Sequence, residues 1–350
     1  MKKSLIALAV LAVSGAAMAQ STVTLYGIAD VWVGSIKSET AGVSTRTTEM
    51  VSGGVSTSRW GMKGSEDLGG GLKANFQFEQ SVSVDTGVTG TGFDRAANVG
   101  FSGGFGAVKL GLAGTAFDDA QAGSVAVFDA DLSPVNGFTT ASGSKNAGAV
   151  FRSVRYTGKV GNQIHYQAPT MGGFSAALSY SLDEKTAYSA TILTPMSVTA
   201  LNVTYAGGPI AAQFAYQKED RDTVSDDMTY TRLGASYNFG MATAKFQYGQ
   251  VKNATGDGTP ALAAGAKTTE WAIGADIPLS AALTLGVGYA KSDDNAAGGD
   301  QERDGYGLAL AYSLSKRTTL YGGLKMMTYD NKVTADTDVT AYAVGVKHTF

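Results

Sequence analysis

Charged and apolar side chains alternate in the stretch "SRWGMKGSEDLGGGLKANFQFE", which spans residues 58–79. Successive residues of a β-strand point to opposite faces of a sheet, so this alternation predicts two strands joined by a glycine-rich turn. Cations gathered on one face attract anions electrostatically, so this pattern indicates ion attraction rather than catalysis. The charged face carries Arg59, Lys63, Lys73 and Glu79, and the apolar face carries Trp60, Met62, Phe76 and Phe78.

Residue types that catalyse reactions or bind metal ions are scarce in this chain. It has no cysteine, and its two histidines, His165 and His348, lie in no recognisable Ser-His-acid motif. No acidic loop has the calcium pattern of an EF-hand, and glycine-rich pieces such as "GGVSTS" lack the lysine and the helix of a phosphate-binding loop. We therefore expect no enzyme, no cofactor and no metal site.

The first residues have the features of a secretory signal peptide. Two lysines precede an apolar run, and "AMA" at 17–19 supplies a cleavage site of small residues. We expect residues 1–19 to be removed and residues 20–350 to form one domain. No other stretch approaches the about 20 apolar residues of a membrane helix. The formal net charge of −3 gives no sign of nucleic-acid binding.

Alternation with a period of two recurs along the rest of the chain, and short connections alternate with long polar ones such as 35–55 and 114–150. A cation on the lipid-facing side of a strand at mid-depth costs about 2–4 kcal/mol, so the charged faces must turn inward and the interior must hold water. These features predict an all-β fold, a 16-stranded antiparallel transmembrane β-barrel with short periplasmic turns and long extracellular loops. The strands are expected near 22–34, 56–65, 72–83, 94–102, 106–113, 151–168, 174–183, 197–206, 210–220, 228–239, 242–252, 269–278, 283–291, 304–313, 318–328 and 338–350.

Four stretches carry a resemblance to one family: "STVTLYGIAD" (21–30), the stretch at 58–79, "DRAANVGFSGGFGAVKLG" (94–111) and "YAVGVKHTF" at the end. They are similar to the general, non-specific trimeric porins of Gram-negative outer membranes, particularly the arginine-lined, anion-selective members with a "VTLYG" first strand. The resemblance implies an outer-membrane location and a homotrimer in contact with outer-membrane lipid and lipopolysaccharide. It also implies that Phe350 is a signal to the barrel-assembly machinery and that the third long loop, 114–150, folds into the lumen.

The resemblance further implies an arginine cluster on the barrel wall that faces acidic residues of the infolded loop. Arg59 and Arg95 match the first two arginines of that pattern, although Arg95 has the parity of the apolar face and must be reoriented by a bulge or by the end of its strand. His165 stands in the place of the third arginine, so Arg155 or Arg152 is expected to substitute from farther up the same strand. Further candidates are the lumen cations Lys63 and Lys325 and the loop acids Asp118, Asp119, Asp129 and Asp131.

These features together predict a diffusion pore that passes small hydrophilic solutes and ions with a preference for anions. At about 7 Å and a dielectric constant of about 80, each cation attracts a monovalent anion by about 0.6 kcal/mol, so three cations enrich anions roughly twentyfold. A substrate-specific channel for a sugar or an organic anion is the alternative, because Tyr26 and Trp32 share an inward face and could form an aromatic slide. An outer-membrane barrel enzyme is a less favoured alternative.

Overall fold

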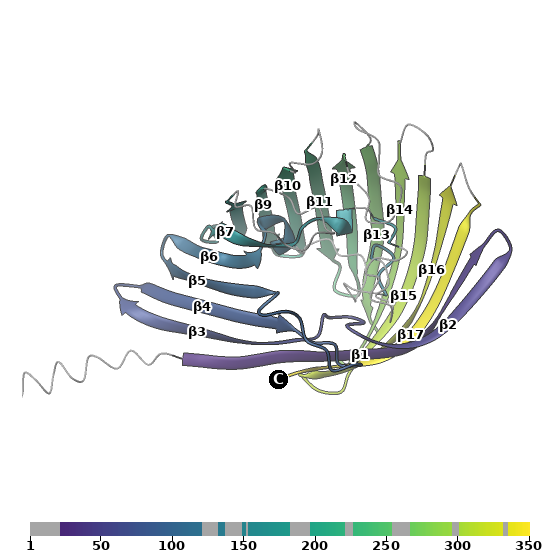
Figure 1. Cartoon of the computed structure of the whole chain (residues 1–350), viewed down its shortest axis with the longest axis horizontal. Helices are drawn as coiled ribbons and strands as arrows, with labels where there is room; N and C mark the ends of the chain where they lie inside the picture. Colours follow the sequence, from purple (N-terminus) through teal and green to yellow (C-terminus); the bar gives the residue numbers. More distant parts are fainter. Residues whose placement is uncertain are drawn as a thin grey trace, which may run out of the picture.

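The structure, a computed structural model, describes residues 22–120, 132–136, 149–151, 153–182, 197–220, 227–253, 267–295, 301–331 and 335–350. The described strands form one antiparallel sheet that closes into a barrel (Figure 1). In chain order they are β1 (Thr22–Thr40), β2 (Val43–Ser52), β3 (Arg59–Gly69), β4 (Leu72–Ser81), β5 (Ala96–Gly103), β6 (Gly106–Gly114), β7 (Lys159–Gln167), β8 (Phe174–Ser181), β9 (Ser197–Gly207), β10 (Ile210–Asp220), β11 (Met228–Asn238), β12 (Thr243–Lys252), β13 (Lys267–Pro278), β14 (Leu283–Asp294), β15 (Gln301–Ser313), β16 (Thr318–Asn331) and β17 (Thr337–Thr349). The short helices α2 (Ala116–Asp119) and η1 (Ser153–Arg155) follow β6.

The seventeen described strands fill sixteen positions around the barrel, because β2 and β3 share one position. β17 pairs with Ile28–Thr40 along one edge of β1. Along the opposite edge, β2 pairs with Val31–Thr40 and β3 pairs with Thr22–Ile28. The predicted 16-stranded antiparallel barrel is therefore confirmed.

The expected loop at 35–55 is wrong, because most of this segment is strand. β1 continues to Thr40 and returns as β2 after a turn at Ala41 and Gly42, whose φ angles are 52° and 77°. Ser, Thr and charged residues occupy both faces of this hairpin, so it shows no apolar alternation. Both of its faces can meet water, and its threonines and valines favour extended backbone.

The expected strand at 151–168 is wrong in its first half. Only Lys159–Gln167 forms a strand there, and η1 precedes it. The backbone N–H groups of Ser153 and Thr157 donate to the carboxylates of Glu270 (3.2 Å) and Glu219 (2.7 Å), which lie on β13 and β10. These contacts to residues distant in sequence hold the chain inside the barrel, and no local pattern reveals them.

The barrel has a polar inner face and an apolar outer face. On β10, the inward-facing Gln213, Gln217 and Glu219 are buried, whereas Phe214 among them is 38% exposed. The same division holds on β17, where Ala341 is buried and Val344 is exposed. Apolar side chains on the outside suit a surface that meets lipid, and a polar interior suits a channel that holds water.

The described parts of segment 114–150 lie inside the barrel. α2 packs on the inner faces of β8 and β9, where the Ala116 N–H donates to the Ser179 hydroxyl (2.9 Å) and the Asn202 amide donates to the Ala116 carbonyl (2.5 Å). Farther along the segment, Leu132 is buried in a cluster with side chains of β1 and β15–β17. The segment thus contacts walls on different sides of the barrel, and the predicted infolding is confirmed for these parts.

The last residue of the chain joins the barrel wall. Phe350 exchanges backbone hydrogen bonds with Gly27, at 3.1 Å in each direction. Its ring lies over Gly27, where an added Cβ would come within 2.2 Å of the ring, so this close approach requires glycine. The role of Phe350 as an assembly signal stays a prediction.

The predicted signal peptide at 1–19 lies outside the described residues. Within the part of the chain that the structure describes, no helix is long and apolar enough to cross a membrane.

Candidate functional site

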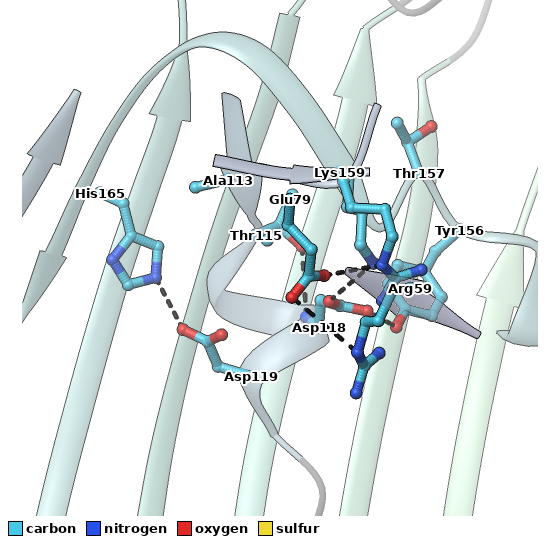
Figure 2. A network of polar contacts seen from close by, with 12 residues as sticks. Arg59, Glu79, Ala113, Thr115, Asp118, Asp119, Tyr156, Thr157, Lys159 and His165 are labelled. Atoms are coloured by element: carbon cyan, nitrogen blue, oxygen red, sulfur yellow. Dashed lines mark hydrogen bonds and ion pairs between the residues drawn. The ribbon is translucent and has the colours of Figure 1, made fainter. Parts of the chain in front are cut away.

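Two arginines share one carboxylate on the inner face of the barrel. The Arg95 Nε lies 2.7 Å from Glu79 Oε1, and the Arg59 Nε lies 3.8 Å from Glu79 Oε2; Arg59 and Glu79 appear side by side in Figure 2. Their side chains are 14%, 27% and 11% exposed for Arg95, Arg59 and Glu79. The group is thus partly hydrated rather than dry.

Tyr26 connects this group to a third cation. Its hydroxyl donates to Glu79 Oε2 (2.9 Å) and accepts from the Gln77 amide (2.7 Å). The Lys63 ammonium lies 5.2 Å from the centroid of the Tyr26 ring, within the range of a cation–π contact. We call the six residues of this group the cationic cluster: Tyr26, Arg59, Lys63, Gln77, Glu79 and Arg95.

Strand pairing explains how β1, β3 and β4 bring these side chains together. Gly61 lies opposite both Tyr26 and Glu79 in the ladder, so the two residues flank a position that has no side chain. A Cβ at Gly61 would come within 2.9 Å of the Tyr26 hydroxyl. The glycine therefore leaves the space through which Tyr26 reaches Glu79.

Arg95 faces the lumen because it precedes its strand. β5 begins at Ala96, and the Arg95 N–H donates to the Glu79 carbonyl (3.1 Å). Just before it, the Asp94 carboxylate accepts the Ser81 N–H (2.8 Å), which fixes the chain as it enters β5. Arg95 has the parity of the apolar face, and its position before the start of β5 allows its side chain to turn inward, as expected from the sequence.

The acids at the start of the infolded segment bind β7 and the chain just before it. Thr115 caps α2, and its hydroxyl accepts the Asp118 N–H (3.2 Å). The Asp119 carboxylate lies 2.7 Å from His165 Nε2. Asp118 accepts the Tyr156 hydroxyl and also lies 3.5 Å from the Lys159 ammonium. Figure 2 shows these contacts along the inner wall.

The remaining predicted site residues are not part of the cationic cluster. Arg152, Asp129 and Asp131 lie outside the described residues. Arg155 lies in η1 and not on a strand, so the parity argument for its inward direction does not hold. Lys325 faces inward but is fully buried, and its ammonium donates to the Asn136 carbonyl of the infolded segment. The predicted roles of these residues in ion attraction stay predictions.

Arg232 is an inner-face cation that sequence reasoning missed. It is 9% exposed, and its guanidinium lies 4.4 Å from the ring centroid of Phe117 and 5.6 Å from that of Tyr156. One of its nitrogens donates to the Ala120 carbonyl (3.4 Å). The alternation on β11 could have found it, since Arg232 shares the inward parity of Tyr230. Its contacts place it against the infolded segment rather than in an open lumen.

The two aromatic residues of the predicted slide do not lie along one open path. Trp32 is 2% exposed and packs in a cluster with Leu132 of the infolded segment. Tyr26 is part of the cationic cluster, where its hydroxyl is bound to Glu79 and Gln77.

The cationic cluster can attract anions to a hydrated wall. It holds three cations and one carboxylate, so two positive charges are in excess. Among the described residues, no group of three His, Cys, Asp or Glu side chains is placed to hold a metal ion.

The apolar outer band, the polar interior and the segment that crosses it define an outer-membrane channel. The chain belongs to the Gram-negative porin family, whose family model matches residues 4–332. It is 36% identical over 370 residues to Outer membrane porin protein 32 of Delftia acidovorans, with 100% of both chains covered. It is 28% identical over 401 residues to an outer membrane porin protein of Bordetella pertussis, again with 100% of both covered.

The solved structure of an anion-selective porin from Comamonas acidovorans is similar to this chain as well. It has a TM-score of 0.73 and 28% identity, and the match covers 95% of this chain and 100% of that one. The fold, the family and these relatives agree that this protein is an outer-membrane porin, a passive diffusion channel.

Proposed function

We propose that this porin passes anions in preference to cations and that the cationic cluster sets the preference. The observation that carries the proposal is the sharing of one carboxylate, Glu79, by two arginines beside Lys63, which leaves two positive charges in excess. The similar porin from Comamonas acidovorans is anion-selective, which supports the proposal.

The size of the preference follows from this charge. At about 0.6 kcal/mol per charge, for about 7 Å and a dielectric constant of about 80, two charges attract a monovalent anion by about 1.2 kcal/mol, an enrichment of about sevenfold. This is below the roughly twentyfold enrichment expected for three unpaired arginines, because Glu79 cancels one of the three charges. Such binding is weak enough for the ion to leave, which conduction requires.

The infolded segment narrows the pore in this proposal. Asp118 and Asp119 fix its start to the wall through Tyr156, Lys159 and His165. Asp129 and Asp131 remain the candidates for acids that face the arginines, and Arg152 or Arg155 remains the candidate for a further cation.

The partners come from the resemblance to the porin family. We propose a homotrimer in contact with lipid and lipopolysaccharide, and we propose that Phe350 is recognised by the barrel-assembly machinery. We propose no catalytic role, because the relatives are channels. A substrate-specific channel is less favoured, since Trp32 is buried and the Tyr26 hydroxyl is already bound.

The reversal potential of the wild-type channel tests the proposal. A planar bilayer that separates about 0.1 M from about 0.01 M KCl should give a potential of the sign that chloride permeation produces, with a permeability ratio of about seven. A potential of the opposite sign would contradict the proposed preference. A current that saturates with one sugar or organic anion would favour the substrate-specific channel instead.

A further inference from the structure

A pocket of about 300 Å³ lies on the inner wall of the barrel and is formed by β1 and β3–β6. Most of the residues that line it have inward parity: on β5 the buried Asn98 faces it, whereas the neighbouring Val99 is 56% exposed on the outer wall. The pocket adjoins the cationic cluster through Lys63 and Gln77 and extends from there toward the turn that joins β3 to β4. This turn is one of the short, periplasmic ones, so the pocket lies on the periplasmic side of the cluster.

Strand pairing arranges the lining in two rows that cross the strands. The row nearer to the cationic cluster contains Lys63 and Asn98, and the next row contains Asn75, Gly100 and Lys109. Gly100 lies directly between Asn75 and Lys109, so the second row lacks a side chain at its centre. An added Cβ at Gly100 would collide with the backbone of β6, so this position requires glycine. The bare position gives the pocket its depth.

Two lysines border the pocket, Lys63 on β3 and Lys109 on β6. Three strand spacings of about 4.8 Å and two residues of about 3.4 Å along the strands separate their Cα atoms, which are therefore about 16 Å apart. Neither lysine forms an ion pair with another described residue, and no carboxylate lines the pocket. The pocket thus has two positive charges and no negative charge of its own.

The lining between the lysines consists of neutral groups that form hydrogen bonds. The Asn98 amide nitrogen donates to the Leu112 carbonyl (3.0 Å), and the Asn75 amide nitrogen donates to the Ser102 hydroxyl (2.9 Å). Each contact leaves the amide oxygen to accept a hydrogen bond from a solute. The hydroxyl of Ser65 also lines the pocket and can donate or accept. A solute that carries both negative charge and hydroxyl groups would match these groups.

We propose that this pocket binds the phosphate group of small solutes between Lys63 and Lys109. A phosphate monoester carries a charge of about −1.5 to −2 and three strong acceptor oxygens, so it attracts both lysines more strongly than chloride does. A volume of about 300 Å³ is at the lower limit of small-molecule sites, so inorganic phosphate or a small ester fits better than a large one. The inference rests on the proposed function only in that the solute passes the cationic cluster on its way to the pocket.

Phosphate block of the chloride current tests the site. Single wild-type channels are recorded in planar bilayers in about 0.1 M KCl at about pH 8, where phosphate groups are dianions. Inorganic phosphate and glycerol 3-phosphate should both reduce the current with similar half-blocking concentrations, and glycerol should not reduce it. Similar values for the two also separate this site from a channel that is specific for one solute.

Lys109→Gln should raise the half-blocking concentration of phosphate about fivefold. This factor follows from the loss of one ammonium about 5 Å from a dianion, at a dielectric constant of about 80 and a Debye length of about 10 Å. Lys109→Arg restores the charge and should restore the block to within about twofold of the wild type. Lys347→Gln removes a lysine of β17 that does not line the pocket, and it should block like the wild type.

The wild-type half-blocking concentration in Lys109→Gln would overturn the proposal. An equal loss of block in Lys347→Gln would also overturn it, because the whole lumen rather than the pocket would then attract phosphate. Block by glycerol would do the same, since no phosphate would be needed.

Reversal potentials in KCl separate this proposal from the proposed anion preference. Lys109 lies about 17 Å along the strands from the level of Arg95, farther than the Debye length of about 10 Å. Lys109→Gln should therefore change the block by phosphate but leave the permeability ratio in KCl nearly unchanged. A wild type that prefers anions but is not blocked by phosphate contradicts only the pocket. A wild type that prefers cations contradicts the proposed function, even if phosphate blocks it.

Discussion

Two walls of this barrel carry the same inward polar pattern and use it differently. On β3–β5 the cationic cluster is partly exposed, with the Arg59 side chain 27% and the Arg95 side chain 14% exposed. On β8–β13 the polar side chains are buried beneath the infolded segment and the chain that follows it. Ser179 and Asn202 bind the backbone of Ala116. Gln217, Glu219 and Glu270 bind the backbone of Thr157 and Ser153. The comparison teaches that the same inward polar pattern either binds the segment, where the segment covers the wall, or stays partly exposed, where it does not.

The largest effect is expected from a substitution on β8–β13, the wall that the infolded segment covers (the covered wall); β3–β5 form the open wall. Gln217 is fully buried, accepts from the Thr115 hydroxyl (2.8 Å) and donates to the Thr157 carbonyl (3.0 Å). Gln217→Leu removes the acceptor of the Thr115 O–H and the donor to the Thr157 carbonyl, at about 1–3 kcal/mol each, so the infolded segment should become at least about tenfold more sensitive to limited proteolysis. Gln77→Leu on the open wall is the matched control and should not change that sensitivity. Equal resistance of Gln217→Leu and the wild type would show that this wall does not hold the segment.

Salt should reduce the anion preference from about sevenfold to below about twofold between about 0.1 M and about 1 M KCl. The Debye length falls from about 10 Å to about 3 Å over this range, and charges on a hydrated wall are screened accordingly. Reversal potentials measured at a fixed concentration ratio check this expectation. If the anion preference persists at the higher salt concentration, it arises from a buried charge such as Arg232, which salt screens less.

Glu79→Gln should raise the anion preference about threefold, because one negative charge worth about 0.6 kcal/mol is removed from the cluster. Glu270→Gln removes a carboxylate that is fully buried on the covered wall, and it should leave the reversal potential unchanged. Equal shifts of the reversal potential in Glu79→Gln and Glu270→Gln would mean that charges on both walls contribute equally, whether or not the infolded segment covers them.

The smallest effect is expected for Tyr26→Phe, which removes a hydroxyl but no charge. The permeability ratio should change by less than about twofold, because Tyr26 positions Glu79 through one hydrogen bond (2.9 Å). Tyr321→Phe removes the buried hydroxyl that donates to Asp30 (2.6 Å) and should lower the stability by about 1 kcal/mol without a change in selectivity. Thermal unfolding measures the role of Tyr321 in stability, and reversal potentials measure the role of Tyr26 in selectivity. A large change of selectivity in Tyr321→Phe would contradict this assignment.

The sequence predicts most of the barrel because strand parity is a local property. Alternation placed Arg59 and Lys63 inward, and the cost of a cation in lipid required a polar interior. The β1–β2 hairpin was missed because both of its faces are polar, so no apolar period marks its strands. Apolar alternation therefore identifies strands that meet the membrane more reliably than it identifies strands in general.

The site is predicted less completely because it depends on contacts across the barrel. Glu79 has inward parity in the sequence, but its position between Arg59 and Arg95 follows from the pairing of β4 with β3 and β5. The turn around Arg155 follows from carboxylates on β10 and β13 that capture the backbone beside it. Such contacts join residues far apart in sequence, and no local spacing encodes them.

The reversal potential of the Arg59→Gln, Arg95→Gln double variant tests the central claim most directly. Lys63 and Glu79 then balance, so the permeability ratio should fall from about seven to about one. Lys347→Gln removes a lysine of β17 that has the parity of the buried Ala341 and Ala343; it is the control and should retain the wild-type sign. If the double variant keeps the full anion preference, the open wall does not set the selectivity of this porin.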